Sequence, residues 1–139
     1  MSNWLRAKVS TEIKNPKPSL FKKALKNMGF YPDYSDKTVH GSFSFEATEQ
    51  VDCVLHTIDD NKPTTIGFIF EETPDNKTQL KISGDFYGLG YDGPEFLKKL
   101  AMQYNFEVTK EAMESQGFTI EETTAKEDQI VVVGYRQVA

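Results

Sequence analysis

One glycine- and aromatic-rich segment, residues 84–91, holds the side chains in this chain that are best suited to recognition chemistry. It combines three aromatic rings, three glycines and one aspartate within eight residues. Glycines let a partner approach the backbone closely, and tyrosines offer both a flat ring and a hydroxyl group. The residues we predict to form a binding surface are Asp85, Tyr87, Gly88 and Tyr91. The alternative is a loop that packs its own aromatics while its aspartate pairs with Arg136.

The letters from Gly88 to Gly93 also match the G-x-G-x-x-G pattern of dinucleotide-binding turns. In that fold the helix after the glycines leads to a parallel strand and directs its N-terminus at a pyrophosphate. Here Pro94 follows the third glycine directly, and Asp92 brings negative charge to the place of the pyrophosphate. A helix N-terminus capped by Asp92, with Glu95 reaching back to it, explains the same residues more simply. We therefore predict a helix cap and no nucleotide cofactor at this point.

Metal-ligating and nucleophilic side chains are few, with one cysteine and two histidines in the chain. Cys53 and His56 are three residues apart, so in a strand they point to opposite faces. Cys53 also lies in an apolar alternation, which is typical of an inert core thiol and not of a nucleophile paired with His40. The sequence predicts no catalytic residues, no metal site and no cofactor, and it favours a non-enzymatic protein.

Charge is distributed unevenly along the chain. The whole chain has a net charge of −5, but residues 1–29 hold seven basic residues and one acidic residue. A short helix is expected to expose three of these bases, Lys22, Lys23 and Lys26. This basic face could bind an acidic protein or nucleic acid, or it could lie over the chain's own acidic remainder. The negative net charge argues against nucleic acid.

Hydrophobic periodicity predicts the elements that position these residues. Alternation predicts a strand over residues 5–9, several short strands between residues 39 and 84, and two more over residues 118–135. A short helix is expected from an N-cap at Ser19 to a stop at Gly29, and residues 30–35 read as a connection. A long helix is expected from Pro94 to Gln116 with one apolar stripe. Residues 130–133 are apolar on both faces, which is typical of a central strand.

The length of 139 residues fits one domain, residues 1–139, with a core that needs no disulfide. Short connections favour antiparallel pairing, so we predict an α+β fold. Its sheet would be mostly antiparallel, with about six to seven strands and one short and one long helix packed on it. A single cysteine and the lack of a long apolar run predict a protein of the cytoplasm that does not enter membranes.

Several motifs, taken in chain order, resemble a known family. They are the Leu-x-x-Ala-Leu helix ending at Gly29, His40-Gly41, Ile66-Gly67-Phe68, Asp85-Phe86-Tyr87-Gly88, Phe96 to Tyr104, Gln116-Gly117-Phe118 and the terminal Arg136. Together they resemble the family called hypothetical chloroplast reading frame thirty-five, which occurs in plastids, cyanobacteria, other bacteria and some phages. This chain has His40 where that family tends to have arginine. The resemblance implies a fold and a location in the cytoplasm, plastid stroma or host cytoplasm, and it supplies no reaction.

Three functions follow from these observations. The first is an adaptor that docks a protein partner through the Asp85–Tyr91 segment. The second is a binder of a small molecule or nucleotide, for which His40, Asp85, Tyr91 and Arg136 would have to converge in one pocket. The third is nucleic-acid binding through residues 1–29. The oligomeric state cannot be read from the sequence.

Overall fold

The computed structural model describes residues 2–8, 13–40, 48–84, 92–126 and 129–137, and these residues form two helices and nine strands. The helices are α1 (Pro18–Asn27) and α2 (Gly93–Ser115). The strands are β1 (Ser2–Lys8), β2 (Phe30–Asp33), β3 (Thr38–His40), β4 (Thr48–Gln50), β5 (Cys53–Thr57), β6 (Pro63–Glu72), β7 (Thr78–Gly84), β8 (Thr119–Lys126) and β9 (Gln129–Gln137). All strand pairs are antiparallel, and the predicted α+β class is confirmed.

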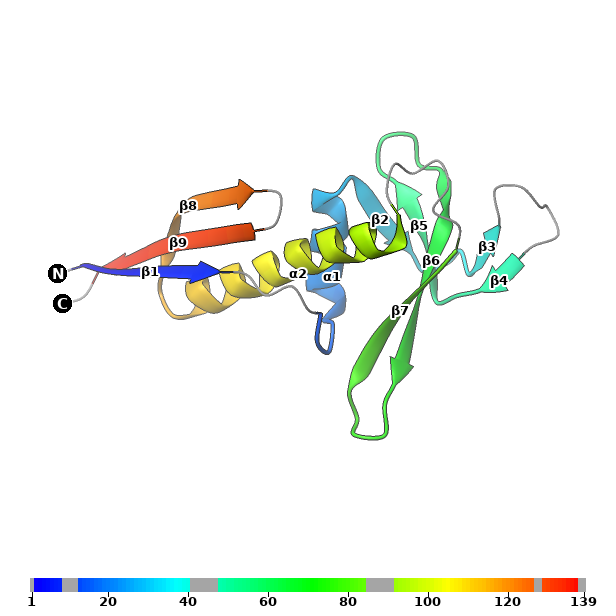
Figure 1. Ribbon diagram of the computed structural model, residues 1–139, viewed down its shortest axis with the longest axis horizontal. Helices are drawn as coiled ribbons and strands as arrows, with labels where there is room; N and C mark the ends of the chain where they lie inside the picture. The colour runs from blue at the N-terminus through cyan, green and yellow to red at the C-terminus, as the bar shows by residue number, and fades with distance from the viewer. Residues whose placement is uncertain (1, 9–12, 41–47, 85–91, 127–128, 138–139) are drawn as a thin grey trace.

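The described strands are divided among three sheets, whereas the sequence predicted one. Their orders are β1-β9-β8, β2-β5-β6-β7 and β3-β4. Figure 1 shows the first sheet at one end of an elongated molecule and the other two at the opposite end, with α2 running between them. A helix of 23 residues is about 35 Å long, long enough to carry a separate sheet on each half. The alternation of apolar and polar residues identifies a strand but does not reveal its pairing partner. The sequence therefore did not predict the division into three sheets.

The larger core lies between the four-stranded sheet and both helices. The ring of Phe21 from α1 packs edge-on against Phe68 and Phe70 of β6, with ring centroids 5.1 and 5.4 Å apart. From α2, Phe96 and Tyr104 enter the same core. The hydroxyl of Tyr104 accepts a hydrogen bond from the Lys17 backbone N–H at 2.8 Å, which fixes the start of α1 against α2.

The two-stranded sheet covers the other face of β5 and β6 through a small core of Val39, Val51 and Val54. Gly67 of β6 makes this close approach possible. A Cβ at that position would lie 2.7 Å from methyl carbons of both Val39 and Val51. The short strands β3 and β4 are thus held against the sheet by valine packing.

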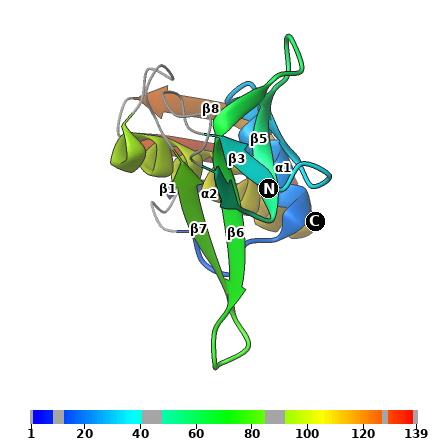
Figure 2. The same cartoon turned by 90° about the vertical axis from the view of Figure 1, so that its right-hand side faces the viewer.

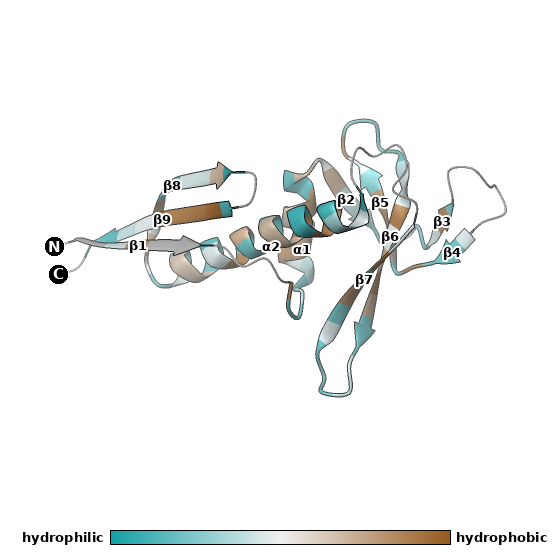
Figure 3. Ribbon diagram, in the orientation of Figure 1, coloured by the Kyte–Doolittle hydropathy of each residue, from teal (hydrophilic) through white to brown (hydrophobic). Residues whose placement is uncertain are grey.

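The second half of α2 packs on the three-stranded sheet. Met102 and Met113 meet Phe118, Ile130 and Val132 in a separate core. In Figure 3 the first part of β9 carries the hydrophobic colour of this core, and β9 lies between β1 and β8. The prediction that residues 130–133 form a central strand is therefore confirmed.

The predicted single stripe on α2 is only partly correct. Phe96, Leu100 and Met113 are buried, but Leu97 and Val108 from the same predicted stripe are 37% and 36% exposed. The two halves of the helix bury different faces because they serve two cores, so no single stripe runs along its whole length.

The ends of the helices follow local chemistry with one exception. The Asp92 side chain accepts a hydrogen bond from the Glu95 N–H at 2.7 Å, as the sequence predicted. Gly29 has φ +92°, the left-handed geometry expected of a helix stop. Ser19 is not the cap of α1, because the helix already begins at Pro18, whose missing N–H suits the first turn. Neither described helix is long and apolar enough to cross a membrane.

Candidate functional site

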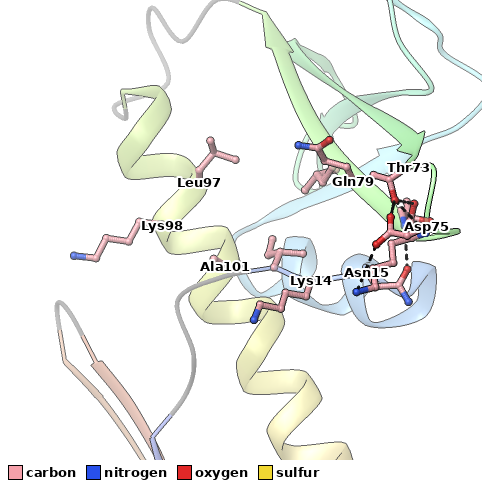
Figure 4. Close-up of a pocket in the computed structure, with 12 residues that line it drawn as sticks. Lys14, Asn15, Thr73, Asp75, Gln79, Leu97, Lys98 and Ala101 are labelled. Carbon is pink, nitrogen blue, oxygen red and sulfur yellow. Dashed lines mark hydrogen bonds and ion pairs between the residues drawn. The ribbon is translucent and has the colours of Figure 1, made fainter.

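A groove of about 910 Å³ lies between the first half of α2, the β6–β7 hairpin and residues 13–15. Its apolar lining comes from Ile13, Leu80, Leu97 and Ala101. Figure 4 shows Leu97 pointing from α2 toward the hairpin, and Figures 1 and 2 show the hairpin projecting from the body of the molecule. These walls come from three segments that are far apart in the sequence, so the groove forms only when the chain folds.

The groove is positively charged although the chain as a whole is acidic. Its charged lining residues are Lys14, Lys77, Lys98 and Asp75, a net charge of +2 against −5 for the whole chain. In Figure 4 Lys98 projects away from the hairpin, at the outer side of α2. A local positive region on an acidic protein attracts anionic groups selectively. The described lining offers ammonium groups and apolar side chains, which bind ligands by charge and by apolar contact.

Hydrogen bonds fix the hairpin tip that forms one wall of the groove. The Thr73 hydroxyl donates to the Asp75 carboxylate, and this bond lowers the pKa of Asp75 below its ordinary value. The same hydroxyl oxygen accepts from the Lys77 N–H at 3.2 Å. Asn15 Oδ1 accepts from the Thr78 N–H at 3.1 Å, which ties the segment before α1 to the start of β7. The lysine at the tip is therefore held on a defined turn.

Among the described residues, one edge strand of the four-stranded sheet forms a wall of this groove. β7 is the last strand of that sheet, and Thr78, Gln79 and Leu80 of β7 line the groove. Alternate residues of an antiparallel strand present their N–H groups to the same side. Because the Thr78 N–H points away from β6 to Asn15, the N–H groups of Leu80 and Ile82 point to the same outer side of β7. At the opposite edge, β2 contains Pro32, which lacks a donor and blocks strand addition.

The structure separates the two described residues of the predicted pocket, His40 and Arg136. His40 is exposed at the end of β3, whereas Arg136 lies in β9. Figure 1 shows the sheets that contain β3 and β9 at opposite ends of the molecule. The other predicted binding residues, Asp85, Tyr87, Gly88 and Tyr91, lie outside the described residues, so their role stays a prediction.

Arg136 contacts the C-terminal end of α2. Its Nη1 donates to the backbone carbonyl of Gln116 at 3.0 Å, and its guanidinium lies 4.7 Å from the centre of the Phe118 ring. Gln116 is the C-cap of α2, where a cation is favourable because the helix dipole ends in free carbonyls. Arg136 therefore ties the three-stranded sheet to the end of the long helix. Its predicted pairing with Asp85 involves a residue outside the described part.

Replacing Arg136 with alanine is expected to lower the stability of the fold by about 1–2 kcal/mol, the sum of a helix-end charge and a cation–π contact. Thermal unfolding should show a lower Tm for Arg136→Ala and a smaller loss for Arg136→Lys, which keeps the charge. Lys126→Ala removes a charge from β8 at an exposed position and serves as the control. Equal Tm values for Arg136→Ala and wild type would contradict this role.

The predicted basic face lies beside acidic residues of α2. The exposed lysines on α1 are Lys22, Lys23 and Lys26. Lys23 shares a shallow hollow of about 310 Å³ with Glu107, Glu111 and Glu114. Lys17, at the start of the same helix, lies 3.7 Å from Glu111. This arrangement favours the alternative in which the basic segment balances the chain's own acidic charge.

A partly buried titratable cluster surrounds His56, which is not among the residues that line the groove. His56 is 8% exposed, and its Nε2 lies 3.0 Å from Asp36 and 3.6 Å from Asp33. Its Nδ1 lies 3.3 Å from the Tyr31 hydroxyl. Hydrogen bonds from Ser35, and then the nearby imidazole, lower the pKa of Asp33. Every partner comes from β2 or the segment after it, so the cluster joins β2 and its neighbourhood to β5.

Sequence reasoning missed the groove because its lysines are isolated along the chain and each one alone resembles an ordinary solvated residue. Among the described residues, no group of three histidine, cysteine or acidic side chains could hold a metal ion. The resemblance to the hypothetical chloroplast reading frame thirty-five family stays a prediction. Comparisons of the chain with protein-family models, curated proteins and solved structures find no significant match.

Proposed function

We propose that this chain is a non-enzymatic binding protein that docks an extended acidic segment of a protein partner in the groove beside β7. The observation that carries the proposal is the position of β7, the last described strand of its sheet, at the wall of a positively charged, partly apolar groove. An added strand would pair with the N–H groups of Leu80 and Ile82. Main-chain pairing of this kind gives affinity, and the flanking side chains give specificity.

The chemistry of the partner follows from the groove lining. Side chains of an extended segment alternate between two faces, so a segment with alternating apolar and acidic residues suits this groove. Its apolar side chains would pack on Leu97 and Ala101 of α2. Its carboxylates would meet Lys14, and Lys98 at the outer side of α2 would add to the positive potential around the groove. This potential speeds association and discriminates against basic segments. The Asp85–Tyr91 segment follows β7 directly in sequence, and we propose that it contributes to the same docking surface.

Fluorescence anisotropy with labelled ten-residue peptides tests this function. An alternating Glu-Val peptide should bind, whereas an alternating Lys-Val peptide should not. A Glu-Val peptide methylated on alternate backbone nitrogens keeps its charge but loses strand pairing, and it should bind about tenfold or more weakly. Equal binding of the methylated peptide would exclude strand addition to β7, and equal binding of all three peptides would contradict the proposal as a whole.

Charge-matched variants locate the site. Lys14→Glu with Lys98→Glu reverses two charges in the groove, and Lys22→Glu with Lys26→Glu makes the same change on α1. Only the groove pair should weaken binding of the Glu-Val peptide, and its effect should shrink with added salt because the lysines are exposed. If the α1 pair weakens binding equally, the groove is not the site.

A small anionic ligand is the second candidate, and the size of the groove favours it. A volume of about 910 Å³ falls within the range of clefts that hold small molecules, roughly 300–1,000 Å³. Such a ligand would place an apolar body on Ile13, Leu80 and Ala101 and an anionic group near the lysines. Native mass spectrometry of the purified protein should then show a bound small molecule that the Lys14→Glu, Lys98→Glu variant loses.

A further inference from the structure

The outer edge of β1 differs from the outer edge of β8, although both strands flank β9. β8 has a bulge between Ile120 and Glu122 and exposes two adjacent acids, and both features protect an edge against further pairing. β1 pairs with β9 without a register shift over seven residues. It also exposes Trp4 by 64% and Leu5 by 36%. Large exposed apolar side chains on a regular edge strand are the features expected of a pairing surface.

We propose that this edge binds a second copy of the chain, with β1 pairing antiparallel to β1 about a twofold axis at Leu5. The register follows from charge. β1 contains two bases, Arg6 and Lys8, and like charges directly opposite each other are destabilising. Centring the pair on Leu5 places Arg6 opposite Trp4 of the second copy and Lys8 opposite Ser2 of the second copy. In this register no base occupies a position directly opposite another base.

The two faces of the three-stranded sheet are also compatible with pairing centred on Leu5. Trp4 stacks on Tyr135 of β9, with ring centroids 5.5 Å apart, so its ring already has a fixed neighbour on one side. Leu5 lies opposite Gly134, on the face that α2 covers, because a Cβ at Gly134 would meet Met113 of α2. Two copies of Leu5 meeting at the axis would join the two helix-covered cores. The result is a six-stranded sheet in which both β1 edges are paired.

An interface of one strand pair is small, so the association should be weak and depend on concentration. Analytical ultracentrifugation of a dilution series should show the 15.8 kDa chain converting to a species of twice that mass. Trp4 is the only tryptophan, so its fluorescence reports on this edge directly. Its emission should shift to shorter wavelength, and its quenching by acrylamide should decrease, over the same range of concentration.

Two substitutions with matched controls test the geometry. Leu5→Lys places like charges at the axis and should abolish the dimer, whereas Val108→Lys, at a position with the same exposure, should leave it unchanged. Leu5→Cys should form a disulfide-linked dimer under mild oxidation because residues facing each other in a strand pair lie within disulfide range. Val108→Cys should not, and Cys53 is buried in both.

Leu5→Lys could abolish the dimer simply by disturbing β1 itself. The Leu5→Cys variant introduces no charge and therefore tests the pairing of the two β1 strands independently. A chain that stays at monomer mass, with no more cross-linking for Leu5→Cys than for Val108→Cys, would overturn the proposal. Masses beyond the dimer would also overturn it, since they indicate head-to-tail pairing of β1 with β8, which does not close. Neither result depends on the groove beside β7.

Discussion

Replacing Gly84 with alanine is expected to destabilise the protein by more than about 3 kcal/mol, the largest effect we expect from a single methyl group. Gly84 ends β7 at φ +134°, a backbone conformation that side-chain-bearing residues rarely adopt. A Cβ there would also lie 2.0 Å from the carbonyl oxygen of Thr65. That contact is with backbone, so no rotation of a side chain relieves it. The end of β7 would have to separate from Ile66 of β6.

Two other glycines allow the cost of the steric clash to be distinguished from the cost of the backbone strain. Gly29 and Gly117 also have positive φ, +92° and +87°, but a Cβ at either position would meet nothing within 4 Å. Alanine at these positions should therefore cost only the strain, about 1–2 kcal/mol. Chemical denaturation of the three alanine variants measures the difference. If Gly84→Ala loses no more stability than Gly29→Ala, the close approach of β7 to Thr65 does not contribute to the fold.

Amide hydrogen exchange adds a local readout for the same variant. Separation of the strand end should raise exchange at the N–H groups near Gly84 and Ile66 but leave the start of β7, at Thr78, protected. The experiment also bears on function, because Gly84 ends the strand at which we propose the docking site. Weaker peptide binding by Gly84→Ala than by Gly29→Ala is the expected consequence.

Local chemistry explains why parts of the fold were predictable. The Asp92 cap and the stop at Gly29 each depend on a few neighbouring residues, so the sequence alone identifies them. The same holds for β9, since a run of branched apolar residues bounded by polar ones is a strong signal for a central strand.

Pairing between distant segments explains what was missed. β2 contains Pro32 and Asp33 and is a strand only because it pairs with β5 over residues 54–57. The exposure of Leu97 and Val108 depends on which half of α2 meets which sheet, and this is a property of the whole fold. The groove is the extreme case, because Lys14, Lys77 and Lys98 come from three segments separated by tens of residues.

The Cys53 thiol is expected to react with thiol reagents at least about a thousandfold more slowly than an exposed cysteine. Burial raises its pKa from 9.0 to about 12, so the reactive thiolate is about a thousandfold rarer near neutral pH. The side chain is also fully buried in the larger core, on a strand flanked by β2 and β6. Reagent can reach the sulfur only when this sheet opens.

Moving the thiol a short distance along the chain provides the control. In the double variant Cys53→Ala, Ile58→Cys, the only thiol sits at a position that is 42% exposed in the wild type, and it should react at the rate of a free peptide. Urea should speed the labelling of Cys53 in the wild type. The free energy of opening derived from these rates should fall with urea concentration as steeply as the free energy of global unfolding, because β5 has neighbours on both edges. Labelling that is fast without urea would show that the four-stranded sheet opens locally. In that case the hairpin beside it could not hold the groove in a defined shape.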